Sequence, residues 1–128
     1  MVYLYSLINL ETSMRLVYKI VPTILWQRAL NSGYFYGSDL DIQDGFIHLS
    51  SFEQVRETAQ KHFKAPNDLM IFAIKDLYLA PDLKWEVSRN NELFPHFYGR
   101  VDLKMLHFVK PLPFDLNGNH LFPDLLNA

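Results

Sequence analysis

The sequence contains no cysteine, and this absence removes several kinds of chemistry. Without cysteine there is no disulfide bond, no thiolate nucleophile and no cysteine-ligated zinc site. The chain also lacks a strong charge of either sign, because its net charge is −2. Since nucleic-acid binding usually needs a basic surface or stripe, nucleic acid is disfavoured as a partner. No apolar run approaches the roughly 20 residues that span a bilayer, so we expect no membrane partner.

Three common sequence motifs are missing as well. The chain has no G-x-S-x-G, no P-loop and no G-x-G-x-x-G. Their absence disfavours an α/β-hydrolase, a P-loop NTPase and a standard dinucleotide-binding domain. The 5 histidines show no i, i+4 pair of the kind that forms a helical metal site. A zinc set of His48, Glu86 and His96 is chemically allowed, but only folding could assemble it, and the sequence predicts no metal.

The composition supports one folded domain. The chain has 128 residues, of which 49% are hydrophobic and 15% aromatic, enough to bury a core. We expect a single domain at residues 16–128, preceded by an N-terminal extension or arm at residues 1–15. The first residues lack the positively charged start and the cleavage site of a signal peptide. Together with the lack of cysteine, this indicates a cytoplasmic protein of unassigned oligomeric state.

The most informative segment is the run D-G-F-I-H-L-S at Asp44–Ser50. It combines a glycine turn, a short buried strand and two serines, Ser50 and Ser51, that precede apolar residues at helical spacing between 52 and 63. The pattern predicts a helix that opens at the serines, with His48 beside its N-terminus, where an anion would bind. Alternation on the strand puts His48 and Ser50 on one face and the apolar Ile47 and Leu49 on the other, buried face. From the residues alone, His48 is a ligand contact or a core histidine, and the serines are helix caps or ligand donors.

The rest of the chain alternates short strands with few helices, which is typical of an α+β fold. The residues between Pro22 and Gly33 have helical spacing, and Leu69–Ile74 reads as a central strand covered on both faces. Further strands are expected at 16–21, 83–87 and 101–109, an aromatic loop or short helix at 93–99, and a plain loop at 34–44.

Two further segments carry candidate chemistry. Glu86 follows Trp85 on an alternating strand, where a desolvated carboxylate could act as a general base or stabilise a developing cation. The alternative places Glu86 in solvent and Trp85 in the core. His96 and Tyr98 are the polar-headed rings of the aromatic segment at 93–99, which forms either a wall for a flat ligand or a plug over the core.

These segments together resemble one family, the DUF952 family of small bacterial proteins of unknown function. The resemblance covers 16–123 and includes D-G-F-I-H-L-S, K-W-E at 84–86 and F-P-H-x-Y-G at 94–99. It implies a fold like that of ADP-ribosyltransferases, in which a split mixed or antiparallel sheet core with a few short helices surrounds a nicotinamide-dinucleotide cleft. Lys19 stands where those enzymes have Arg or His, and Lys lacks both the planar fork and the ring.

The resemblance implies a nucleotide or ribosyl ligand, with NAD and ADP-ribose as examples and no cofactor established. It leaves open whether the chain is an enzyme, such as an ADP-ribosyl or related glycosyl or phosphoryl transferase. Two alternatives are a non-catalytic small-metabolite binding module and a protein-interaction domain that uses the aromatic segment Phe94–Tyr98. The candidate catalytic residues are His48, Glu86 and His96, and the candidate ligand-binding residues are Lys19, Asp44, Ser50, Ser51, Trp85 and Tyr98.

Overall fold

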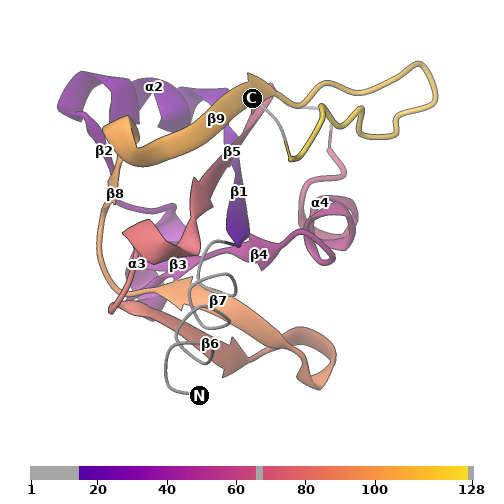
Figure 1. The fold of residues 1–128 in the computed structure, drawn as a ribbon. Helices are drawn as coiled ribbons and strands as arrows, with labels where there is room; N and C mark the ends of the chain where they lie inside the picture. Colours follow the sequence, from indigo (N-terminus) through magenta and orange to yellow (C-terminus); the bar gives the residue numbers. More distant parts are fainter. Residues whose placement is uncertain (1–14, 66–67, 127–128) are drawn as a thin grey trace.

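Three antiparallel sheets form the fold of the computed structural model, which describes residues 15–65 and 68–126 (Figure 1). The sheet orders are β4-β1-β5-β9, β3-β7-β6 and β2-β8. The strands are β1 (Leu16–Pro22), β2 (Tyr34–Phe35), β3 (Ile47–His48), β4 (Ser50–Ser51), β5 (Leu69–Lys75), β6 (Leu83–Val87), β7 (Leu93–Phe97), β8 (Val101–Asp102) and β9 (Leu106–Pro111). The helices are α2 (Thr23–Ser32), α3 (Asp39–Asp44) and α4 (Val55–His62), with 3-10 turns η1 (Asp76–Tyr78), η2 (Arg89–Asn91) and η3 (Leu103–Met105).

The four-stranded sheet is buried on both faces. Its central pair, β1 and β5, is in register from Leu16 opposite Lys75 to Pro22 opposite Leu69. One apolar cluster covers the face with Val17 and Phe72, and a second covers the face with Tyr18 and Ile71, joined by α4 and residues near the C-terminal end. The apolar run at 69–74 therefore forms a strand covered on both faces, as predicted.

The chain passes from one sheet to another at Leu49. Strand β3 pairs with β7 in the three-stranded sheet, whereas β4 pairs with β1 in the four-stranded sheet. Between them, the backbone N–H of Leu49 donates to the carbonyl of Pro95 at 3.0 Å. Ile47 and Leu49 are buried in the core, so the predicted alternation along this run is confirmed.

The helix predicted to open at Ser50 and Ser51 begins later, at Val55, so this prediction is wrong at its start. The two serines instead form β4, because pairing with β1 satisfies their backbone groups. Part of the predicted capping geometry survives, since Oε1 of Gln54 accepts from the backbone N–H of Ser51 at 3.0 Å. Neither serine side chain caps α4.

Three other segments differ from the sequence prediction. The expected loop at 34–44 contains β2 and α3, and the expected loop or helix at 93–99 contains β7. β7 lies between β3 and β6, and pairing on both sides outweighs its proline content. The strand expected at 101–109 is divided into β8 and β9, because the Asp102 side chain accepts from the backbone N–H of Lys104 and turns the chain.

The fold class is therefore a single α+β domain with antiparallel sheets and few helices, as predicted. In Figure 1 the β6–β7 hairpin lies beneath the four-stranded sheet, with α3 and β3 between them. The predicted arm at residues 1–15 lies outside the described residues, except for Arg15. The detailed likeness to ADP-ribosyltransferases stays a prediction.

Two glycines with positive φ differ in what surrounds them. Gly37 has φ +124°, and a Cβ there would lie 2.8 Å from Cβ of Asp41, whereas Gly45 has φ +85° and nothing within 4 Å. We predict that Gly45→Ala costs about 1–2 kcal/mol through backbone strain, and that Gly37→Ala costs more because it also displaces Asp41. Urea unfolding of both variants measures the difference. Equal losses would show that the contact with Asp41 does not matter.

Candidate functional site

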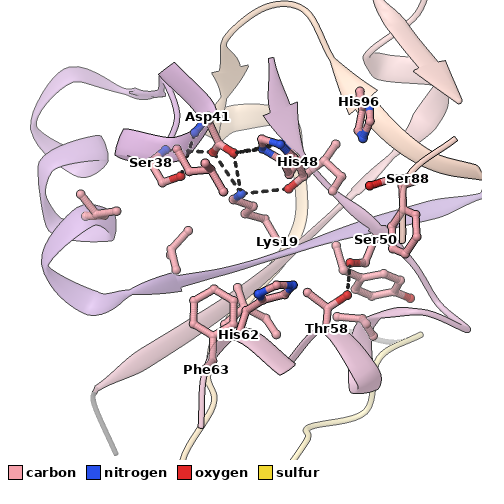
Figure 2. A pocket seen from close by; sticks show the side chains of 18 of the residues that line it. Lys19, Ser38, Asp41, His48, Ser50, Thr58, His62, Phe63, Ser88 and His96 are labelled. Carbon is pink, nitrogen blue, oxygen red and sulfur yellow. Dashed lines mark hydrogen bonds and ion pairs between the residues drawn. The ribbon is translucent and has the colours of Figure 1, made fainter. Parts of the chain in front are cut away.

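A pocket of about 520 Å³ lies where the sheets meet (Figure 2). Residues of β1, α2, α3, β3, β4, α4 and β7 line it, together with Arg89 of η2. Its volume is within the usual range for small-molecule sites. Apolar side chains such as Ile20, Leu25 and Phe63 form part of its wall. Its polar wall includes Lys19, Asp41, His48, Ser50, Thr58, Arg89 and His96.

The buried carboxylate of Asp41 organises one side of this pocket (Figure 2). Its Oδ1 lies 2.6 Å from Nδ1 of His48 and 3.1 Å from Nζ of Lys19, and it also accepts from the backbone N–H of His48 at 3.1 Å. Its Oδ2 accepts from the backbone N–H of Ser38 at 2.9 Å. Ser38 and Asp41 form a reciprocal capping box at the start of α3, which fixes the carboxylate in place.

Lys19 and Asp41 form a buried ion pair, with Nζ 3.0 Å from Oδ2. Burial alone would raise the pKa of Asp41, but the ammonium of Lys19 and hydrogen bonds from Ser38 and His48 outweigh it and lower this pKa. Burial lowers the pKa of Lys19, and the carboxylate of Asp41 opposes that effect. The ammonium also donates to the carbonyl of His48 at 2.9 Å, so its contacts are with the protein.

His48 is held at both ring nitrogens. Nδ1 contacts Asp41, and Nε2 lies 2.9 Å from Oδ2 of Asp44 at the end of α3. Both ring nitrogens of His48 are therefore engaged by carboxylates of the protein. The predicted ligand residue Asp44 thus lies against His48 and is not among the described residues that line the pocket.

His96 has a different arrangement, with one ring nitrogen held and the other free of described partners. Its Nδ1 lies 2.9 Å from Oε1 of Glu86, and the hydroxyl of Tyr98 donates to the same oxygen at 2.7 Å. The hydrogen bond from Tyr98 is the largest cause that lowers the pKa of Glu86, and the bond from His96 also lowers it. The bond between Tyr98 and Glu86 in turn raises the pKa of Tyr98. No hydrogen-bond partner is found for Nε2 of His96 among residues 15–65 and 68–126.

The Phe46 ring joins the two histidine clusters. Its centroid lies 4.1 Å from the stacked ring of His96 and 4.6 Å from that of His48. The β3–β7 register places His48 opposite His96, with ring centroids 5.6 Å apart. Segments around positions 48, 86 and 96 of the chain therefore meet at one edge of the pocket.

The remaining predicted residues are divided between the pocket and the core. The Ser50 hydroxyl lines the pocket, 2.9 Å from that of Thr58. Ser51 is buried and does not line it. Trp85 is on the opposite face of β6 from Glu86, packed against the apolar core, with the Arg15 guanidinium 4.4 Å from its ring centroid. Neither Ser51 nor Trp85 is brought to the pocket.

Sequence reasoning missed several polar residues of this site, and Asp41 and Arg89 are the most important of them. The spacing of Ser38 and Asp41 fits a capping box and could have revealed α3, but nothing local indicates that Asp41 binds Lys19 and His48. Arg89 of η2 contacts Thr58, which lies 31 positions away in the sequence, so no local sequence pattern indicates the contact. Both residues depend on pairing between distant segments.

Two further features are absent from the described part of the chain. Within it, no group of three or more His, Asp or Glu side chains is placed to hold a metal ion. None of its helices has the length and hydropathy needed to cross a bilayer.

Comparisons with known proteins identify the family but no activity. The profile of a family described as "Protein of unknown function (DUF952)" matches residues 20–109. The crystal structure of CC0527 from Caulobacter crescentus is 40% identical, covers 83% of this chain and 93% of its own, and has a TM-score of 0.77. The solution NMR structure of CC0527 is 41% identical over 81% of this chain and 90% of its own, with a TM-score of 0.72. No curated protein matches the chain.

The match covers well over half of the sequence, and the solved relatives share its fold. The chain belongs to the DUF952 family, as the motifs at 44–50, 84–86 and 94–99 predicted.

The contact between Tyr98 and Glu86 can be tested by titration. We predict that Tyr98→Phe raises the pKa of Glu86, because the lost hydrogen bond favours the ionised carboxylate. Carboxyl-detected NMR over an acidic pH series measures this pKa. Tyr36→Phe, which removes an exposed hydroxyl that contacts Arg100 and not Glu86, is the control. An unchanged Glu86 titration in Tyr98→Phe would contradict the described geometry.

Proposed function

We propose that this protein binds a nucleotide or ribosyl ligand, such as NAD or ADP-ribose, in the pocket between β1, β4, α4 and β7. The observation that carries the proposal is the convergence of Lys19, His48, Ser50 and His96 on one pocket. These residues come from four strands, and the sequence, with its family resemblance, indicates each of them as a candidate. A mixture of apolar wall and a few polar groups is typical of a small-molecule site.

His96 is the acid/base group of the proposed site. Because the Glu86 carboxylate can only accept, Nδ1 of His96 donates to it as an N–H, and Nε2 is left to accept or donate a proton. This arrangement of a carboxylate behind an imidazole is the one that orients a general base in other enzymes. Glu86 is not among the described residues that line the pocket, so in this proposal it positions His96 and does not contact the ribose.

His48 and Lys19 have a supporting role in the same proposal. Both nitrogens of His48 contact carboxylates, and the Lys19 ammonium contacts Asp41 and a backbone carbonyl. They shape and polarise the wall of the pocket. A transferase activity would therefore rest on His96 and not on a pair of free histidines.

The strongest competing function is a non-catalytic binding module that uses the same pocket. The engagement of both His48 nitrogens favours this alternative, because it leaves one imidazole for chemistry. A protein-interaction surface at Phe94–Tyr98 has less support. In that segment Phe94, Pro95, His96 and Phe97 are buried and Tyr98 is exposed, so the segment presents little aromatic surface.

A steric block of the pocket tests the proposal. Leu25 lines the pocket, whereas its neighbour Ile24 is exposed and does not. We predict that the wild type binds ADP-ribose or NAD in titration calorimetry, and that Leu25→Trp weakens binding at least about tenfold, roughly 1.4 kcal/mol. Ile24→Trp, the matched control, leaves the affinity unchanged. Absence of binding by the wild type at millimolar ligand would reject the proposal.

The same samples separate an enzyme from a binding module. Glu86→Gln keeps the pocket wall but alters the group that orients His96. If the protein is a transferase, this variant binds NAD with near wild-type affinity and releases nicotinamide more slowly, as proton NMR of the ligand would show. Binding without nicotinamide release in the wild type would assign the protein to the non-catalytic class.

A further inference from the structure

Arg89 is a pocket cation whose guanidinium is held in place but not saturated. Its Nη2 donates to Oγ1 of Thr58 at 3.2 Å, and its guanidinium carbon lies 4.9 Å from the ring centroid of Phe94. Its Nε is buried and has no hydrogen-bond partner among the described residues. The carboxylate of Glu57 lies 3.5 Å from Nε but is about half exposed and also faces Lys61. The guanidinium thus retains capacity for a further acceptor.

Lys19 differs from Arg89 in this respect. Its ammonium contacts both carboxylate oxygens of Asp41 and the carbonyl of His48. An ammonium has three protons, so a ligand anion would have to displace protein acceptors from Lys19. Arg89 can donate to a ligand anion without giving up as many contacts with the protein as Lys19 would.

The neighbouring hydroxyl groups offer an acceptor beside Arg89. The Thr58 hydroxyl donates to the carbonyl of Gln54 at 3.1 Å, which uses its single proton. The Ser50 hydroxyl, 2.9 Å away, must then donate to Thr58. Ser50 keeps its lone pairs for a donor in the pocket, while Arg89 donates to the same Thr58 hydroxyl and has further N–H groups.

We propose that Arg89, and not Lys19, binds a phosphate group of the ligand, while Ser50 accepts a hydrogen bond from a nearby ribose hydroxyl. This inference rests on the proposed function. It specifies the ligand groups that the pocket would recognise, which are a phosphate and a neighbouring sugar hydroxyl. The planar guanidinium suits phosphate because it can donate through two parallel N–H groups. The cation–π contact with Phe94 and the hydrogen bond to Thr58 hold the guanidinium in place.

Calorimetry with ADP-ribose tests this assignment. We expect Arg89→Gln to weaken ADP-ribose binding at least about tenfold, since a hydrogen bond to a charged group is lost. Lys61→Gln is the matched control, because it removes an exposed cation that faces the same carboxylate, Glu57, outside the pocket. This control should change the affinity by less than about twofold. Phosphorus NMR of the bound ligand should show its phosphate resonances shifted by the wild type and less shifted by Arg89→Gln at saturation.

Circular dichroism would reveal a folding defect in Arg89→Gln. Arg89→Lys keeps the positive charge and provides a second variant in that case. We expect Arg89→Lys to bind several-fold more weakly than the wild type, because an ammonium lacks the planar fork. If the wild type binds ADP-ribose and both Arg89 variants bind it equally well, the assignment of Arg89 is wrong while the proposed function stands. If the wild type does not bind ADP-ribose or NAD, both are rejected.

Discussion

The buried contact of Asp41 with Lys19 and His48 is the interaction on which the rest of the site depends. Asp41 comes from α3, Lys19 from β1 and His48 from β3, so one carboxylate fixes three segments of the chain. His48 lies opposite His96 in the β3–β7 pair, and the Phe46 ring contacts both imidazoles. The position of His96, and hence the geometry of the proposed site, follows from this buried carboxylate through a short series of contacts.

A buried ion pair is not by itself a large source of stability. Removing two charges from water costs several kcal/mol per ion, and the attraction between them offsets this cost only with good hydrogen bonds. Asp41 meets that condition, because its oxygens also accept from the backbone of Ser38 and His48. The pair therefore specifies one arrangement of β1, α3 and β3. It also commits Lys19 to the protein, which is why our proposal assigns ligand phosphate to Arg89.

The sequence predicted those parts of the structure that depend on local pattern. Alternation identified the buried side of Ile47 and Leu49, and the apolar run at 69–74 identified the central strand. Prediction failed where distant pairing decides the outcome. Ser50 and Ser51 have the composition of helix caps, but pairing with β1 makes them a strand. Pro95 argues against a strand, yet β7 forms because it has partners on both sides. Asp41 falls in a segment that the sequence predicts as a loop. Its partners Lys19 and His48 lie 22 and 7 positions away, so no local pattern indicates its role.

The pH dependence of unfolding for Asp41→Asn tests the central role of this carboxylate most directly. The pKa of Asp41 is lowered in the folded protein, so its contribution to stability is complete above its unfolded value of about 4 and is lost as the pH falls through the folded pKa. We expect Asp41→Asn to lose about 3–5 kcal/mol of unfolding free energy at neutral pH, and to show a weaker dependence on pH below about 4 than the wild type. Asp39→Asn, an exposed carboxylate on the same helix, should match the wild type. An Asp41→Asn variant with wild-type stability and an unchanged acid profile would contradict the account.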